Sequence, residues 1–153
     1  MRRKRVLFLC IGNSCRSPMA EGFARCYGSD VLEAGSAGLA PAAIVQPMTK
    51  KVMEEKNINL NGIVPREITS LDLNSFDLIV NMSGRKLPIN TAAEVQDWTV
   101  EDPIGKDESV YIAARDKIEM MVMRLILDLR KKVSPGRPER KPRKTQVPAP
   151  AAD

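Results

Sequence analysis

The segment from Arg5 to Pro18, RVLFLCIGNSCRSP, constrains the fold of this chain more than any other. Its apolar run, VLFL, is too short for a buried helix and is typical of a strand that is covered on both faces. Gly12 and Asn13 tolerate left-handed backbone conformations, and Ser-Pro at the end of the segment is typical of a helix start. We therefore expect Cys10 at the end of a buried strand. The short loop after it can turn its N–H groups inward at the positive end of a helix, forming a socket for a tetrahedral oxyanion.

Strand and helix patterns alternate along the rest of the chain. This alternation predicts a parallel sheet with right-handed crossovers. A tight turn is expected at Gly35 to Gly38. The expected strands are Val6 to Cys10, Val31 to Ala34, Phe76 to Met82 and Val95 to Val100, and the expected helices are Pro18 to Tyr27, Pro47 to Lys56 and Ser109 to Lys132.

The net charge of +5 lies at the two ends of the sequence. Residues 2–5 are all basic and residues 133–153 are net basic, so residues 6–132 are slightly acidic. This distribution, with only 4% aromatic residues, argues against a nucleic-acid-binding core. We expect one domain over 1–132 and a disordered, proline-rich basic tail over 133–153, which is either a plain solvated tail or a docking segment.

Several classes of protein are excluded by composition. No apolar run approaches the roughly 18 residues of a membrane span, and the basic start is a poor signal peptide, so we expect a cytoplasmic protein. We also expect it to be a monomer or weak dimer. Three cysteines do not indicate a disulfide framework. The absence of histidine removes His-based metal sites and His-assisted triads, and no metal or cofactor is expected.

Cys10 and Arg16, bridged by Gly and Asn, form a pattern that suits phosphoryl transfer. The thiolate would attack phosphorus while loop N–H groups and the guanidinium bind the equatorial oxygens. The positive surroundings favour the thiolate, and Ser17 can donate a hydrogen bond to its sulfur. The alternative is an ordinary buried strand-end cysteine with a solvated arginine.

The loop resembles the phosphate-binding loop of the low-molecular-weight protein tyrosine phosphatases, a family that includes the related thioredoxin-coupled arsenate reductases. The resemblance continues through Gly35 to Gly38, Phe76 to Met82 and Asp102-Pro103, and it covers residues 5–132. It implies an α/β three-layer sandwich with a four-stranded parallel sheet of order 2-1-3-4 flanked by helices.

The resemblance also implies roles for individual residues. Asp102 would be the general acid and then the base for the attacking water, whereas spacing alone would equally fit an Asp-Pro turn. Asn13 would adopt a strained conformation. Ser36 either hydrogen-bonds Asn13 from the neighbouring loop or is a simple turn serine, and Cys15 would either form a reversible disulfide with Cys10 or simply fill space. The implied phosphate-binding residues are Ile11, Gly12, Asn13, Ser14, Cys15 and Arg16, and the implied pocket walls are Ile11, Leu39 and Ile104, aliphatic where many relatives carry tyrosines.

Three functions compete at this point. The leading interpretation is a hydrolase that acts through a phosphocysteine on phosphotyrosine in proteins or on a small phosphomonoester. An arsenate reductase on the same scaffold is the alternative. It needs relay thiols, and the segment after Met82, SGRKLP, has no cysteine, although a Cys10–Cys15 route through glutathione stays open. A non-catalytic phosphate-binding module is the third interpretation.

Overall fold

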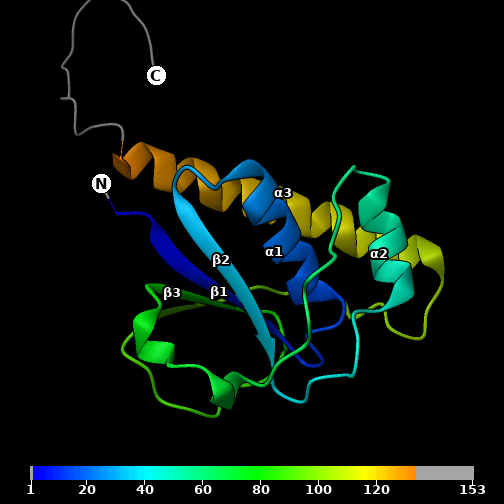
Figure 1. The fold of residues 1–153 in the computed structure, drawn as a ribbon, viewed down its shortest axis with the longest axis horizontal. Coiled ribbons are helices and arrows are strands. Elements are labelled where there is room, and N and C mark those ends of the chain that lie inside the picture. Colours follow the sequence, from blue (N-terminus) through cyan, green and yellow to red (C-terminus); the bar gives the residue numbers. More distant parts are fainter. Residues whose placement is uncertain (1, 134–153) are drawn as a thin grey trace, which may run out of the picture.

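The computed structural model describes residues 2–133, which form a four-stranded parallel sheet in the order β2-β1-β3-β4. Helices α1 and α3 lie side by side against one face of the sheet (Figure 1). The predicted α/β fold and strand order are confirmed, whereas the predicted tail lies outside the described residues except for Val133. The elements are β1 Lys4–Cys10, α1 Arg16–Tyr27, β2 Leu32–Gly38, α2 Pro47–Glu54, η1 Ile68–Ser70, η2 Leu73–Ser75, β3 Leu78–Asn81, β4 Glu94–Asp97 and α3 Glu108–Val133.

Strand β1 is the centre of the core, as its apolar run predicts. Val6 to Leu9 are each 0% exposed. Alternate side chains enter two clusters: Val6 and Phe8 pack toward α1 and α3, while Leu7 and Leu9 pack toward η1 and η2. Burial on both faces fixes the register of β1, and this in turn fixes where Cys10 ends the strand.

Strand β2 differs from its prediction, because it continues through the segment expected to be a turn. Gly35 pairs with Leu7 and Gly38 pairs with Cys10, so the glycines extend the ladder rather than ending it. Pairing with the central strand overrides their local turn preference. The other two strands are shorter than predicted, and β4 ends at Asp97, before the buried Trp98 and Val100.

The parallel arrangement gathers the carboxyl ends of the strands at one edge of the sheet, which is where ligand sites of open α/β sheets form. Cys10 ends β1, Gly38 ends β2 and Asn81 ends β3 at this edge. Within residues 2–133, no helix is long and apolar enough to cross a membrane.

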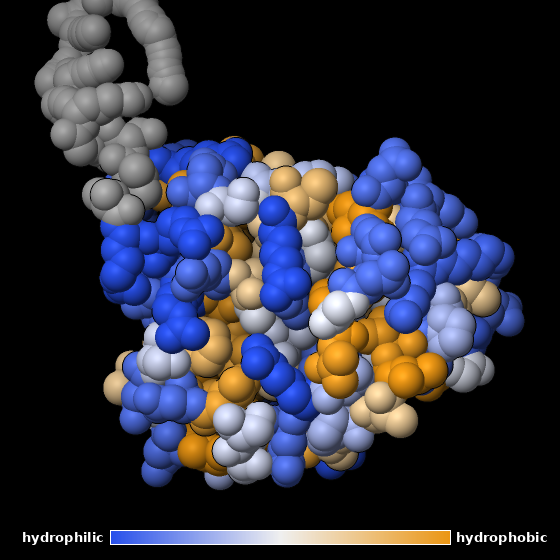
Figure 2. Space-filling view, in the orientation of Figure 1, coloured by the Kyte–Doolittle hydropathy of each residue, from blue (hydrophilic) through white to orange (hydrophobic). Residues whose placement is uncertain are grey.

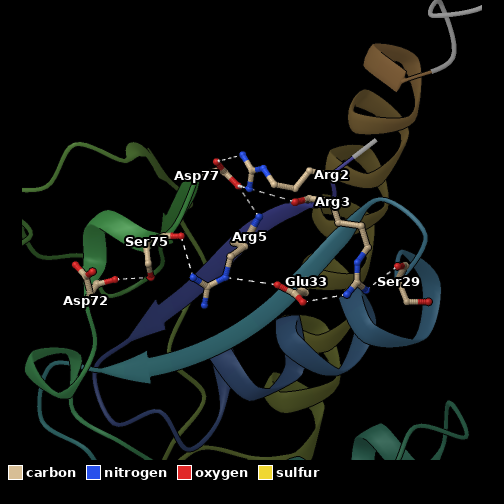
Figure 3. A network of polar contacts seen from close by, with 8 residues as sticks. All are labelled: Arg2, Arg3, Arg5, Ser29, Glu33, Asp72, Ser75 and Asp77. Atoms are coloured by element: carbon tan, nitrogen blue, oxygen red, sulfur yellow. Dashed lines mark hydrogen bonds and ion pairs between the residues drawn. The ribbon is translucent and has the colours of Figure 1, made fainter.

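At the amino-terminal ends of the strands, Asp77, which immediately precedes β3, binds the segment at the start of β1. Its carboxylate accepts hydrogen bonds from Arg2 at 3.0 and 2.9 Å and from the main-chain N–H of Arg5 at 2.7 Å. Figure 3 shows Asp77 between these two residues. The pKa of Asp77 is lowered to about 2. The hydrogen bond from Arg2 is the main cause, and the hydrogen bond from the Arg5 amide is a further one.

Replacing this carboxylate, as in Asp77→Asn, is expected to lower the free energy of unfolding by about 1 kcal/mol at pH 6. A carboxylate whose pKa is lowered by folding stabilises the protein at pH values above its pKa in the unfolded state. This stabilisation is lost as the pH falls through its pKa in the folded state. The difference from wild type should therefore shrink between about pH 4 and pH 2 in urea unfolding experiments. Asp97→Asn, at an exposed position on β4, is the control. A difference that stayed constant down to pH 2 would contradict the assignment.

Candidate active site

The loop between β1 and α1 turns its carbonyl groups away from its own centre. The N–H groups of residues 11–15 donate to no other group within residues 2–133, and so are available to an oxyanion. Four carbonyl oxygens of the loop accept from the segment after β2: Cys10 from Leu39 at 3.2 Å, Ile11 from Ala40 at 2.8 Å, Gly12 from Ala42 at 2.9 Å and Ser14 from Gln46 at 2.8 Å.

Cys10 lies at the base of this loop and is 2% exposed. Its Sγ lies 3.0 Å from Ser17 Oγ, and the main-chain N–H of Ser17 points to the same sulfur at 3.4 Å. Two groups from the first turn of α1 therefore surround the thiol and can stabilise negative charge on it.

Asn13 takes the left-handed conformation, with φ of 50°, which costs about 1–2 kcal/mol for a residue other than glycine. Its buried side chain is held on three sides. Nδ2 donates to Ser17 Oγ and to Ser36 Oγ at 2.9 Å each, and Oδ1 accepts from the main-chain N–H of Arg66 at 3.0 Å. These bonds offset the backbone cost and fix the shape of the loop.

Glu21, which the sequence analysis missed, completes this buried polar cluster. Its side chain is 5% exposed, accepts a 2.5 Å hydrogen bond from Ser36 Oγ and forms an ion pair with Arg25. A signal was present, since Glu21 and Arg25 follow Ser17 at successive four-residue steps on one face of α1. A continuous chain of contacts therefore runs from Arg25 at the surface to Cys10.

Arg16 is also buried, and its guanidinium reaches two other strand ends. Nη1 donates to the carbonyl oxygens of Met82 at 2.6 Å and Val100 at 3.2 Å. Nη2 lies 3.4 Å from Oδ2 of Asp102, whose side chain is 43% exposed and whose Oδ1 accepts from the N–H of Ile104 at 3.2 Å. The structure thus brings Asp102 to the predicted rim, beside the arginine of the loop.

The other predicted residues lie around the same loop. Ile11 and Leu39 are half-buried, and Ile104 is exposed. Ser14 Oγ is buried and has no hydrogen-bond partner among residues 2–133. No group of three His, Cys, Asp or Glu residues suited to a metal ion occurs in that part of the chain, so the socket is built from amides, hydroxyls and a guanidinium.

The two remaining cysteines differ from Cys10 and from each other. Cys15 is buried against the core, and burial is the main cause that raises the pKa of its thiol to about 12. Cys26 is exposed near the far end of α1. All three thiols are free.

Comparison with known proteins gives a consistent set of relatives. The family model described as low molecular weight phosphotyrosine protein phosphatase matches residues 5–135. A glutaredoxin arsenate reductase of Synechocystis is 33% identical over 127 residues, which cover 80% of this chain and 96% of that protein. An arsenate reductase of Bacillus cereus is 36% identical over 126 residues, covering 80% and 93%. The solved structure of an arsenate reductase in the phosphate binding state superposes with a TM-score of 0.75 at 31% identity, covering 82% of this chain and 98% of the other.

These relatives correct the leading interpretation of the sequence. The prediction of a phosphomonoester hydrolase acting on phosphotyrosine is wrong, because the relatives at 33–36% identity are named arsenate reductases. The error has a physical origin. Phosphate and arsenate are both tetrahedral oxyanions, so a loop of amides, a thiol and a guanidinium is equally suited to either.

Replacing Gly38 by alanine is expected to weaken binding of inorganic phosphate by roughly ten- to hundredfold, because it displaces the loop. A Cβ at this position would lie 2.7 Å from the carbonyl oxygen of Ile11 and 2.9 Å from the main-chain nitrogen of Asn13, and backbone atoms cannot easily move aside. Isothermal titration calorimetry measures the dissociation constant. The control is Gly35→Ala on the same strand, whose new Cβ would meet only side-chain atoms. Equal affinities in the two variants would contradict the role of Gly38.

Proposed function

We propose that this chain, which belongs to the low molecular weight phosphotyrosine protein phosphatase family, reduces arsenate to arsenite with electrons from external thiols. The observation that carries the proposal is the match to proteins named arsenate reductases over 80% of the chain. The oxyanion loop around Cys10 supplies the chemistry. Its free N–H groups and buried arginine suit a small tetrahedral dianion.

In the first step Cys10 Sγ attacks arsenic. A sulfur–arsenic bond forms, and one arsenic–oxygen bond breaks, so that its oxygen leaves as water. Asp102, beside Arg16 at the rim, donates the proton that this oxygen needs. Arsenic remains pentavalent, and the loop amides with Arg16 hold the remaining oxygens.

In the second step another thiolate attacks Cys10 Sγ. A disulfide bond forms, the sulfur–arsenic bond breaks, and its electron pair stays on arsenic, which leaves as trivalent arsenite. A second equivalent of thiol then attacks the disulfide and returns Cys10 to the thiolate. Arsenate and two thiols are thus converted to arsenite, one disulfide and water.

The attacking thiol of the second step comes from outside the chain. Cys15 is held as the protonated thiol by burial, with its pKa raised to about 12, and a protonated thiol is a poor nucleophile. Cys26 lies ten residues beyond Arg16 on α1, about 15 Å along the helix. A small-molecule thiol such as glutathione, recycled by a glutaredoxin-type dithiol, fits these constraints and fits the name of the Synechocystis relative.

The same chemistry favours the cytoplasm. Cys10 must be a free thiolate at the start of each cycle, and the external thiol must be kept reduced. Both conditions are met where glutathione is maintained in its reduced form.

The proposal is tested by NADPH-coupled arsenate reduction with glutathione and a glutaredoxin, measured for three cysteine variants. Cys10→Ser is expected to abolish turnover, because it removes the sulfur that bonds to arsenic. Cys15→Ser and the matched control Cys26→Ser should retain it, because neither thiol takes part. If Cys15→Ser also abolished turnover, the resolving thiol would be internal. Hydrolysis of p-nitrophenyl phosphate without arsenate reduction would overturn the proposed function.

Replacing Asp102 by asparagine is expected to lower kcat for arsenate reduction by about a hundredfold, since the proton donor is lost. Affinity for arsenate should not weaken, because a negative charge beside the anion is removed as well. Steady-state kinetics and calorimetry separate the two quantities. Glu101→Gln is the control, because this neighbouring carboxylate pairs with Lys106 at the surface. Equal losses of kcat in both variants would contradict the acid role of Asp102.

A further inference from the structure

A groove rich in arginine runs along edge strand β2, away from the loop at Cys10. It encloses about 430 Å³, and its lining includes the four arginines Arg3, Arg5, Arg25 and Arg66, which come from three segments of the chain: the start of β1, helix α1 and the segment before η1. In the view of Figure 2, strongly hydrophilic side chains cross the face over β2, with apolar surface between them. Four guanidinium groups from three segments of the chain concentrate positive potential in this groove.

One acidic side chain, Glu33, is part of the lining and neutralises only a fraction of this charge. It binds Arg3 at 3.0 Å and lies 3.5 Å from Arg5, so it holds these two arginines at one end of the groove. Figure 3 shows Glu33 between them. With one carboxylate for two guanidinium groups, this end keeps an excess of positive charge.

At the other end, Arg66 lies beside Gly35 and Arg25. Its Nε donates to the carbonyl oxygen of Ser36 at 3.0 Å, and its two terminal nitrogens have no hydrogen-bond partner within residues 2–133. Gly35 makes room for this guanidinium, since a Cβ there would lie 3.0 Å from Nη2. The terminal nitrogens are therefore available to a ligand, and Arg25, whose one acidic partner is the buried Glu21, adds its charge nearby.

The two ends are separated by the span from Glu33 to Ser36, which is about 10 Å along a strand. We propose that this groove binds a small molecule that carries a phosphate group at each end. Guanidinium groups bind phosphate through two parallel hydrogen bonds, and a ligand with two phosphates would engage both ends at once. This site is independent of the proposed arsenate chemistry.

A ligand that engages both ends of the groove does not reach the catalytic loop. Gly35 pairs with Leu7, which precedes Cys10 by three residues, or about 10 Å along β1, and the groove extends from there toward the start of the strand. The groove and the loop are therefore separate anion sites.

The test is isothermal titration calorimetry of the full chain with fructose 1,6-bisphosphate as the probe. Inorganic phosphate is added only at the concentration that occupies the loop at Cys10, so that a probe engaging both ends of the groove at once still displaces single phosphate ions from it. Wild type is expected to bind one probe molecule. Arg66→Gln should weaken the binding at least about tenfold, because it removes charged hydrogen bonds to the phosphate. Glu33→Gln should strengthen it, because Arg3 and Arg5 are released toward the ligand.

The matched control is Lys117→Gln, which removes the same charge at an exposed position on α3. Its affinity should equal that of wild type, and circular dichroism of each variant checks the fold. The proposal is overturned if the probe does not bind wild type under these conditions. It is also overturned if Lys117→Gln weakens binding as much as Arg66→Gln, or if Glu33→Gln does not strengthen it.

Discussion

The hydrogen bonds around the Asn13 side chain are the interaction on which the rest of the site depends. The residue adopts φ of 50°, and the three bonds to Ser17, Ser36 and Arg66 all converge on its amide. They tie together the start of α1, strand β2 and the segment before η1. If the Asn13 amide were lost, the loop would lose the geometry that turns its N–H groups inward.

This cluster pre-organises the proposed oxyanion site at the carboxyl edge of the sheet. The loop carbonyls are bound outward by the segment after β2, and Arg16 is fixed by the carbonyl oxygens of Met82 and Val100. Little therefore has to be ordered when an anion binds, and fixed dipoles act more strongly on charge that develops during the reaction than water does. The buried Glu21 extends the same network to the surface and links the loop to Arg25.

Much of this was predictable from the sequence, because its determinants are local. The run of residues 6–9 predicts a doubly buried strand, and the Gly-Asn and Ser-Pro pairs predict the turn and the helix after it. The helix begins two residues earlier than predicted, because α1 starts at Arg16 with Cys15 at the N-cap rather than at Pro18 with Ser17 as the cap. What could not be predicted depends on contacts between distant segments. Gly35 to Gly38 have turn propensity but pair with β1. The helical spacing of Ser17 and Glu21 places them on one face of α1, but it does not indicate that Glu21 binds Ser36 on β2.

The choice between hydrolysis and reduction could not be read from the loop either, for a chemical reason. Both reactions begin with attack of a thiolate on a tetrahedral oxyanion, and they diverge only in what attacks next: water at the central atom, or a thiol at the sulfur. The missing relay cysteines after Met82 argued against reduction only if the second thiol had to be internal. Once the buried Cys15 and the distant Cys26 are set aside, an external thiol satisfies the same electron balance.

Arg66 shows how one residue can contribute to two proposed sites. Its main-chain N–H binds Asn13, and its carbonyl oxygen accepts from Gly38 at 2.9 Å, so its backbone belongs to the support of the oxyanion loop. Its guanidinium points instead into the arginine-rich groove beside β2. Because the backbone and the side chain of Arg66 contact different residues, replacing the side chain can change the groove while the contacts that hold Asn13 stay in place. The two proposed anion sites can therefore be separated by experiment even though they share a residue.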